Sequence, residues 1–445
     1  MINFISNWWH SFQFKSALQQ GNKRKAIKFL RVIEKSGARL SYLEKLFRDK
    51  LQFEDSAKQY KTETAILNGK LNTALQELEK KIDLPVSIEN KNNPTLTPEQ
   101  DFIAFIHKTF NLIQHDENKL QCTGIDKRIF DDFEAQLVEY LKEEFRRIPE
   151  KQLSIKLEDA LEDINSLKCG KDPDYRFSLT PHVYYMKYFL ENVYCLYLAW
   201  FLIYESGLLS TNINILDIAA GPGTVAYGLA LFLQSTSGFF NLPQIHISYY
   251  SLEKQNVFQF RGLQFWRRYI ESRKTPINAF FRFVTSDIFT WNQQSSNIPT
   301  DFFDFVVISH CFFNDSTKSS QANSIYQQII DLSLKNEGYA LLILQDKKLY
   351  KAYNTSQSED CEQEKRLINK LLQELGLELV WYRYLTSTGF RGSLGAEFSK
   401  FASEKLPKQL YMTTILQKYL SQKFQSRYTL DDYIILAKKF KNPQI

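Results

Sequence analysis

The segment at residues 215–224, Ile-Leu-Asp-Ile-Ala-Ala-Gly-Pro-Gly-Thr, constrains the fold of this chain more than any other. An apolar run ends at Asp217 and passes directly into a loop of small residues, after which residues 225–233 have the pattern of a helix. This order of strand, acidic residue, glycine turn and helix brings the backbone of an α/β sheet close to a nucleotide-like ligand. Gly221 and Gly223 give the loop φ freedom, and they lack the Cβ atoms that would block such a ligand.

Patterns typical of strands and helices alternate along the chain from about residue 180. A long aromatic-rich helix is expected at 181–204, and further helices at 255–273 and 360–375. Strands that alternate with helices form mostly parallel sheets with right-handed crossovers. The sequence therefore predicts a seven-stranded, mostly parallel, doubly wound α/β sheet. Its strands are expected at 214–218, 245–252, 281–285, 303–309, 340–344, 377–385 and 409–417.

The N-terminal part of the chain is predicted to be all-α. An apolar stripe with spacings of three and four residues runs along 67–82, as in a helix of a small bundle or a short coiled coil. Polar segments at 89–97 and 168–174 interrupt the helical patterns. The predicted regions are 1–95 and 96–175, both helical, an α/β domain at 176–418, and a helical tail at 419–445 whose helix begins at Thr429.

Composition sets broad limits on the class of protein. The 445 residues are enough for two or three domains, and the net charge of +6 permits a nucleic-acid partner without arguing for one. The five cysteines form no Cys-x-x-Cys pair, which argues against a disulfide framework or a zinc site and favours a reducing cytoplasm. No cleavable signal is evident, and the most apolar segment, 193–209, is short for a bilayer and contains Glu205. We expect that segment to be a buried helix, with no transmembrane segment in the chain.

Acidic side chains follow the second and third predicted strands. Glu253 ends the second strand, and Asp287 follows the third. The carboxyl ends of parallel strands meet at one edge of an open α/β sheet, where such sheets bind ligands. A carboxylate at Glu253 supplies the two acceptors that paired ribose hydroxyls need. The alternatives are that Glu253 caps a helix or is a surface acid, that Asp287 belongs to a simple turn, and that Asp217 only stabilises the loop.

This succession resembles motif I and the later strand ends of class I S-adenosylmethionine-dependent methyltransferases. The motif is a carboxylate followed by three alternating glycines, and this chain departs from it because the first glycine is replaced by Ala219. The resemblance implies a sheet of the class I methyltransferase type and S-adenosylmethionine as the cofactor. The implied cofactor-binding residues are Asp217, Ala219, Gly221, Gly223, Glu253, Asp287, Ile288 and Ser309.

The resemblance also implies roles for single residues. An acid at Asp287 accepts the adenine amine, Ile288 packs on the adenine ring, and the end of the fourth strand faces the methyl donor. His310 is then the candidate catalytic base, because the ordinary pKa of histidine is near neutrality. The other interpretation is that His310 lines the cofactor pocket or caps the strand. The chain lacks the Asn/Asp-Pro-Pro-aromatic signature of amino-group methyltransferases, which disfavours transfer to exocyclic amines.

Three further features concern binding surfaces. Tyr184, Tyr188 and Glu191 share one face of the helix at 181–204, which is either plain core or a wall beside the acceptor. Arg391 follows the sixth predicted strand, where it is placed to reach an anionic acceptor. A basic face at 23–31 favours contact with RNA or lipid phosphate, or is a solvated helix surface.

The leading hypothesis is an S-adenosylmethionine-dependent methyltransferase whose acceptor is RNA, protein or a small molecule, with a possible RNA or protein partner at the helical N-terminal half. The alternative is a non-catalytic methyltransferase-fold assembly protein that docks a partner through its helical regions. An NAD-linked oxidoreductase is disfavoured, because Val225 and Ala226 stand where a further glycine would open the helix. Residues 221–224 and 307–310 also look faintly like ribosomal small-subunit methyltransferase-like proteins.

Overall fold

The computed structural model describes residues 2–19, 22–36, 41, 44, 47, 94–169, 173, 175, 177–273, 275–293, 298–313, 315–391 and 395–440. The chain divides into two compact units. One comprises residues 1–88 with 176–178, and the other comprises 89–175 with 179–445. Within the described residues, no helix combines the length and the apolar character needed to cross a membrane.

Helices α1 (Ile2–Gln19) and α2 (Lys23–Lys35) of the first unit pack against each other. The side chain of Asn22 caps α2 by accepting a hydrogen bond from the backbone N–H of Lys25 at 3.1 Å. The apolar stripe predicted at 67–82 lies outside the described residues. The buried residues between α1 and α2 are Phe14, Ala17, Ala26, Leu30 and Ile33.

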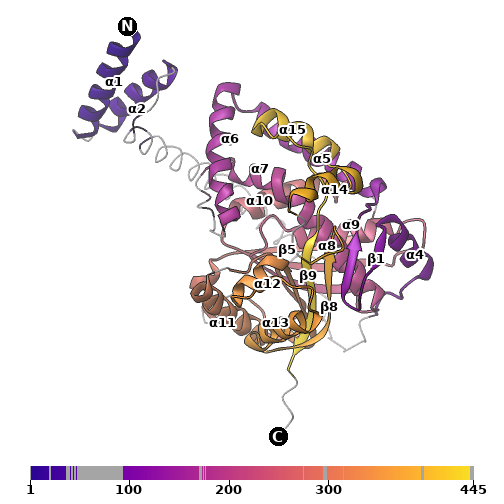
Figure 1. Ribbon diagram of the computed structural model, residues 1–445. Coiled ribbons are helices and arrows are strands. Elements are labelled where there is room, and N and C mark those ends of the chain that lie inside the picture. The colour runs from indigo at the N-terminus through magenta and orange to yellow at the C-terminus, as the bar shows by residue number, and fades with distance from the viewer. Residues whose placement is uncertain are drawn as a thin grey trace, which may run out of the picture. The chain divides into compact units, whose positions relative to one another are not determined.

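The second unit is built on a nine-stranded sheet in the order β1-β2-β8-β9-β7-β6-β3-β4-β5 (Figure 1). Strands β5, β4, β3, β6 and β7 are mutually parallel, whereas β9 runs antiparallel between β7 and β8. The chain leaves β3 toward β5 and then returns to β6 on the other side of β3. The sheet is therefore doubly wound, with its switch point between β3 and β6.

The strands match most of the predicted ones, and the sheet is mixed, with an uninterrupted parallel part from β7 to β5. Their bounds are β1 Leu112–Gln114, β2 Lys119–Cys122, β3 Asn212–Ile218, β4 Ile245–Glu253, β5 Ile277–Thr285, β6 Phe303–Ser309, β7 Leu334–Gln345, β8 Leu377–Thr386 and β9 Asp431–Lys439.

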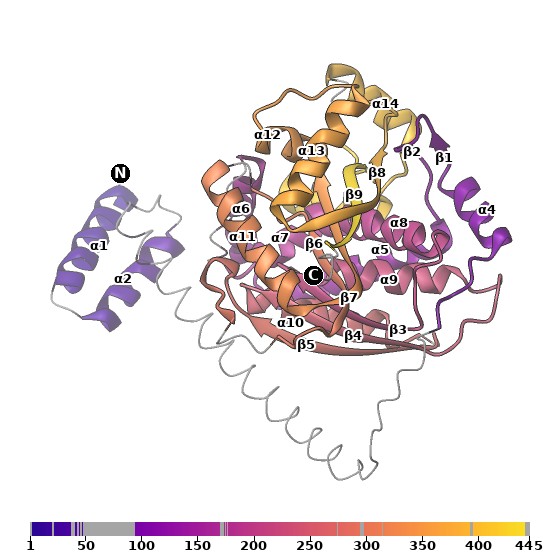
Figure 2. The same cartoon turned by 90° about the horizontal axis from the view of Figure 1, so that it is seen from below.

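Helices cover both faces of the sheet (Figure 2). Val306 of β6 faces the core beneath α11 and α13, and its neighbour Phe305 contacts Trp200 of α8 on the opposite face with ring centroids 5.2 Å apart. Helix α8 is the apolar segment expected to be buried, and its residues 193–204 are all buried. The larger helices are α4 Gln100–Thr109, α5 Lys127–Arg146, α6 Glu150–Asn165, α7 Thr180–Tyr184, α8 Leu190–Glu205, α9 Thr224–Ser235, α10 Asn256–Tyr269, α11 Ser316–Ser333, α12 Asp346–Ala352, α13 Cys361–Glu374, α14 Phe398–Lys405 and α15 Leu410–Leu420.

The strand predicted at 409–417 is wrong, because these residues lie in helix α15. Their content of β-branched and aromatic residues favours a strand, but the burial pattern has helical spacing, so tertiary packing overrides composition. The buried residues of α15 are Met412, Thr413, Ile415 and Leu416.

The helix predicted from Thr429 is also wrong, because residues 431–439 form β9 at the centre of the sheet. All six residues at 432–437 are buried. A strand that is buried on both faces has no polar alternation, so its pattern cannot be distinguished from that of a buried helix. The seventh strand of the doubly wound sheet is therefore supplied by the predicted tail.

The prediction that the N-terminal region is all-α is wrong at the hairpin of β1 and β2. These two antiparallel strands extend the sheet, with Leu120 of β2 paired to Leu385 of β8 in parallel. They account for nine strands rather than the predicted seven. Strands of three and four residues are too short to establish a periodic pattern, so helical neighbours dominate the prediction.

Candidate cofactor site at the carboxyl edge of the sheet

The carboxyl ends of four parallel strands lie level at one edge of the sheet. Ile218 of β3 pairs with Leu252 of β4 and with Ile308 of β6. The next residue along each of these strands therefore reaches the same edge, beside the switch point where doubly wound sheets bind ligands. These residues are Ala219, Glu253 and Ser309, and Glu253 pairs in turn with Thr285 of β5.

The loop after β3 has three residues with positive φ. Ala219 has φ +57°, Gly221 has +53° and Gly223 has +84°, and Gly223 directly precedes α9. A left-handed conformation is unfavourable for an alanine by roughly 1–2 kcal/mol, which explains why a glycine is expected at the position of Ala219. A Cβ atom at Gly221 would meet no atom within 4 Å, so the loop has an open side there.

Glu253 is buried at 8% exposure and faces this loop. Its Oε2 accepts a hydrogen bond from the backbone N–H of Gly221, and its Oε1 accepts one from Gln255, both at 2.8 Å. The alternative that Glu253 caps a helix also has some basis, because the backbone N–H that it binds belongs to Gln255, the residue just before α10. Each carboxylate oxygen carries two lone pairs, which is the type of acceptor that paired ribose hydroxyls need.

Asp217 lies beneath the loop and is almost completely buried. The hydroxyl of Tyr249 donates a hydrogen bond to it, and the same hydroxyl lies 3.5 Å from the Cβ position of Gly223. Burial raises the pKa of the Asp217 carboxyl to about 8, although the hydrogen bond from Tyr249 acts in the opposite direction. Asp217 therefore holds the Tyr249 hydroxyl that lies beside Gly223, and its carboxyl is a much weaker acid than an exposed aspartate.

Asp287 and Ile288 follow β5 at the outer end of the edge. Asp287 begins a short helical turn by accepting a hydrogen bond from the N–H of Phe289 at 3.1 Å, and it forms an ion pair with Lys254 at 2.9 Å. Ile288 is only 7% exposed and belongs to the core beneath α11 and α13. Asp287 therefore borders the edge, while most of Ile288 is occupied by packing.

His310 follows β6 with φ +57°, and its side chain is 17% exposed. Its Nδ1 lies 3.5 Å from an oxygen of Asp432, and its carbonyl accepts a hydrogen bond from the ammonium of Lys348 at 3.0 Å. Burial lowers the pKa of His310, the charge of Asp432 opposes this, and that of Lys348 reinforces it. A lowered pKa keeps the imidazole neutral at pH 7, as a catalytic base requires.

The edge contains buried polar atoms whose hydrogen bonding is not satisfied within the described part of the chain. Neither ring nitrogen of His310 nor the hydroxyl oxygen of Ser309 has a hydrogen-bond partner among the described residues. Buried polar atoms are nearly always hydrogen-bonded, so such a group indicates a place for a ligand or water. The donors and acceptors present therefore fit a polar, nucleoside-containing cofactor.

Two side chains at this edge, Asp432 and Lys348, were not predicted from the sequence. Asp432 pairs with Gln345 at the end of β7, because the start of an antiparallel strand lies level with the ends of its parallel neighbours. The expected helix in this segment concealed that placement. The adjacent acids Asp431 and Asp432 before an apolar run were the available signal.

An aromatic wall from the helix before β3 borders the site. A π-helical turn at Tyr185–Phe189 joins α7 to α8, and such turns are frequent at functional sites. The ring of Tyr184 lies 5.0 Å from that of Phe258 and 5.7 Å from that of Tyr188. Burial raises the pKa of Tyr184, and the nearby charges of Glu253 and Asp217 raise it further. The predicted aromatic face therefore packs against α10, the helix that begins just after Glu253.

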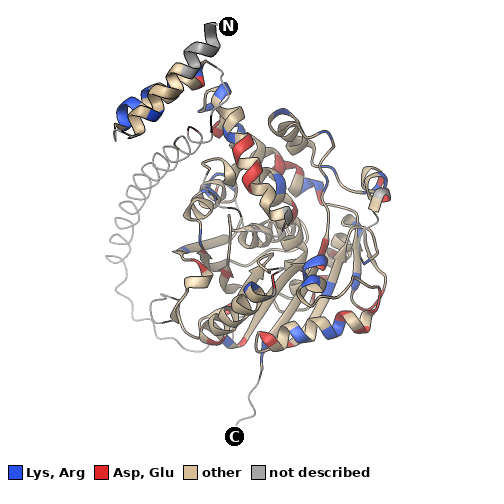
Figure 3. Ribbon diagram, turned by 60° about the vertical axis from the view of Figure 1, so that its left-hand side comes forward, with Lys and Arg blue, Asp and Glu red and all other residues tan. Residues whose placement is uncertain are grey.

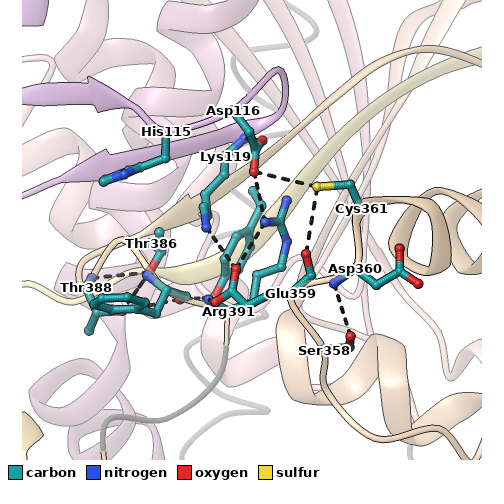
Figure 4. A network of polar contacts seen from close by, with 12 residues as sticks. His115, Asp116, Lys119, Ser358, Glu359, Asp360, Cys361, Thr386, Thr388 and Arg391 are labelled. Carbon is teal, nitrogen blue, oxygen red and sulfur yellow. Dashed lines mark hydrogen bonds and ion pairs between the residues drawn. The ribbon is translucent and has the colours of Figure 1, made fainter.

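The prediction that Arg391 reaches an anionic acceptor is wrong. Its side chain is 1% exposed and is enclosed by carboxylates of the protein (Figure 4). Its guanidinium forms ion pairs with Glu364, with Asp116 at 2.9 Å and with Glu359 at 3.5 Å. These partners come from distant parts of the chain, so local sequence gives no indication of them.

No protein-family model matches the chain, and no curated protein matches it either. The structure is similar to an S-adenosylmethionine-dependent methyltransferase from Methanosarcina mazei, with 16% identity over 53% of this chain and 95% of that chain and a TM-score of 0.31. A methyltransferase from Clostridium acetobutylicum has 11% identity, 58% and 96% coverage and a TM-score of 0.29. Fibrillarin from Methanococcus jannaschii, a pre-rRNA processing protein, has 12% identity, 52% and 68% coverage and a TM-score of 0.28.

The chain's own structure has three features of interest at this edge: the doubly wound strand order, the glycine loop at the switch point, and an acidic residue level with that loop on the neighbouring strand. That arrangement is the one that the resemblance to class I methyltransferases implied.

Proposed function

We propose that the chain is an S-adenosylmethionine-dependent methyltransferase, with the cofactor bound at the carboxyl edge of β3, β4, β5 and β6. One observation carries this proposal. The glycine loop, Glu253 and Ser309 reach the same edge of the sheet, on the two sides of the switch point. The buried side-chain polar atoms of Ser309 and His310 also support it, because they have no hydrogen-bond partner within the described residues.

The proposed roles follow from the positions of the side chains. Glu253 accepts the ribose hydroxyls, Asp287 accepts the adenine amine, and Asp217 binds the ammonium of the methionine part. The open side at Gly221 admits the cofactor close to the backbone. Ile288 offers only its exposed edge to the adenine ring, because most of it is buried.

When bound, S-adenosylmethionine would supply the methyl group of its sulfonium to a heteroatom of the acceptor, and the electron pair of the broken carbon–sulfur bond would stay on sulfur. His310 would take the proton that the acceptor loses. The neutral imidazole that burial maintains suits this role. Most of the rate enhancement comes from holding the two reactants in line.

Calorimetric titration of S-adenosylmethionine into the full chain tests the proposal. We expect saturable binding, and we expect Glu253→Ala to weaken it by at least about tenfold, or 1.4 kcal/mol, because both ribose acceptors are lost. Glu271→Ala, which removes an exposed acid just after α10, should leave the affinity unchanged. Absence of binding by the wild type would refute the cofactor assignment, and binding without methyl transfer to any cell extract would favour a non-catalytic scaffold.

A partner for the N-terminal unit is proposed from the charge of α2 (Figure 3). All six basic residues of this helix are exposed, and only one acidic residue accompanies them. Such a surface favours contact with the phosphates of RNA, whose binding weakens steeply with salt. A salt titration of RNA binding by wild type and by Lys25→Glu/Lys28→Glu tests this, and equal affinities would contradict it.

A further inference from the structure

A pocket of about 470 Å³ lies between the start of α8, helices α14 and α15, and the segment that leads into β9. Helices α14 and α15 are inserted between β8 and β9, so this part of the pocket is an addition to the doubly wound sheet. The volume is within the usual range for small-molecule sites, roughly 300–1,000 Å³. Lining residues used below are Tyr188, Glu191, Phe398, Phe424, Arg427 and Thr429.

The pocket lies near the residue proposed as the catalytic base. Thr429 lines the pocket, and Asp432, three residues further along the same segment, has an oxygen 3.5 Å from Nδ1 of His310. Tyr188, which also lines the pocket, contacts Tyr184 of the aromatic face. The segment that leads into β9 therefore connects the pocket to His310.

The pocket has a cation that carries no protein counter-ion. Arg427 donates hydrogen bonds to the carbonyl of Leu406 at 2.9 Å and to the side-chain oxygen of Gln425 at 3.1 Å, and both acceptors are neutral. Among the described residues, no carboxylate forms an ion pair with Arg427. A guanidinium with free donors binds carboxylates and phosphates well.

An acid, Glu191, also lines the pocket, and its surroundings favour the protonated form. Burial raises the pKa of Glu191 to about 8, the charge of Asp432 raises it further, and the hydrogen bond with Thr429 lowers it. A neutral carboxyl group can donate and accept hydrogen bonds without requiring a counter-ion. The exposed ring of Phe424 and the ring of Phe398 add apolar surface to the pocket lining.

We propose that this pocket binds the methyl acceptor, and that the acceptor is a small molecule with an anionic group for Arg427 and a reactive O–H or N–H directed toward Glu191 and His310. This inference rests on the proposed function, because it assigns the pocket to the second substrate of the same reaction. The anionic group is a carboxylate or a phosphate, since a guanidinium binds both through the same pairs of oxygens.

Binding of simple aromatic anions to the full chain tests the inference. The probes are benzoate and phenyl phosphate, which distinguish the two anionic groups, and benzamide, which has the ring without the charge. We expect at least one anion to bind, benzamide to bind at least about tenfold more weakly, and Arg427→Gln to weaken the anion by a similar factor. Lys423→Gln, an exposed cation on the same segment and outside the pocket lining, should have no effect.

Several outcomes would overturn the inference. They are equal binding of benzamide and the anions, unchanged anion binding by Arg427→Gln, or binding of an RNA oligonucleotide while neither aromatic anion binds. Titration of S-adenosylmethionine into Arg427→Gln separates the two proposals, because this variant should keep the wild-type cofactor affinity. If the cofactor binds and the anions do not, only the pocket assignment fails; if the cofactor does not bind, the proposed function fails.

Discussion

At the scale of the residue, Asp217 has the most informative chemistry. It is buried beneath the glycine loop with Tyr249 as its hydrogen-bond donor, and its pKa is raised to about 8. At pH 7 the carboxyl is therefore mostly protonated before a ligand arrives. A cationic ammonium beside it favours the carboxylate and lowers its pKa, so binding should release a proton.

We predict that S-adenosylmethionine binding at pH 7 releases up to about one proton from Asp217. Calorimetry in buffers of different ionisation enthalpy measures this release. Asp217→Asn should abolish the buffer dependence and weaken binding, since an amide carries no negative charge. Glu134→Gln is the matched control, because Glu134 is another buried acid whose pKa is raised by burial, to about 7. Its carboxylate accepts a hydrogen bond from the backbone N–H of Met412. The same buffer dependence in Asp217→Asn would contradict the role of Asp217.

The residues of the candidate site differ in how far the sequence could predict them. Asp217 and Gly221 belong to one continuous motif, and Glu253 ends a clearly patterned strand, so local information was sufficient to place them. Asp432 and Arg427 come from a segment whose fold was predicted wrongly, so their place in the site was not expected. A site residue can be predicted from the sequence only where the helix or strand that positions it is itself predicted correctly.

At the scale of the element, the exchange between α15 and β9 shows what patterns can determine. β9 was predicted as a helix because its buried run has no alternation, and α15 was predicted as a strand because its composition favours one. The strands from β3 to β8 have the expected order along the chain because glycines, acids and polar loops mark where each one ends. Packing alone decides the assignment where those markers are absent.

Amide hydrogen exchange tests the assignment of β9. We predict that the amides of 432–437 exchange among the slowest in the chain, because β9 is hydrogen-bonded to β7 on one side and to β8 on the other. Opening these amides requires separation of central strands, whereas the exposed face of α15 should exchange sooner. Rapid exchange throughout 432–437 would contradict the central position of β9.

At the scale of the whole molecule, the Arg391 cluster connects parts of the chain that are far apart in sequence. Asp116 lies in the turn between β1 and β2, Glu364 lies in α13, and Arg391 follows β8. Glu364 is fully buried and also accepts a hydrogen bond from the hydroxyl of Tyr433 in β9 at 2.7 Å. Removal of one member of a buried ion pair leaves the other charge without compensation.

We predict that Arg391→Ala lowers the free energy of unfolding by roughly 3–5 kcal/mol, as measured by urea denaturation. Adding Glu364→Gln should restore at least part of the loss, since the uncompensated carboxylate is then removed. Arg366→Ala is the control, because Arg366 is 74% exposed and lies 3.9 Å from Asp360, a pair that should contribute less than about 1 kcal/mol. Equal unfolding midpoints for wild type and Arg391→Ala would show that the cluster does not stabilise the fold.

The crystal structure of the chain with S-adenosylhomocysteine tests the central claim most directly. We expect the ligand across the ends of β3, β4, β5 and β6, with its ribose hydroxyls on Glu253 and its sulfur near Ser309 and His310. The pocket beside Glu191 should then open toward that sulfur. A ligand bound elsewhere, or Glu253 directed away from the ribose, would contradict the assignment.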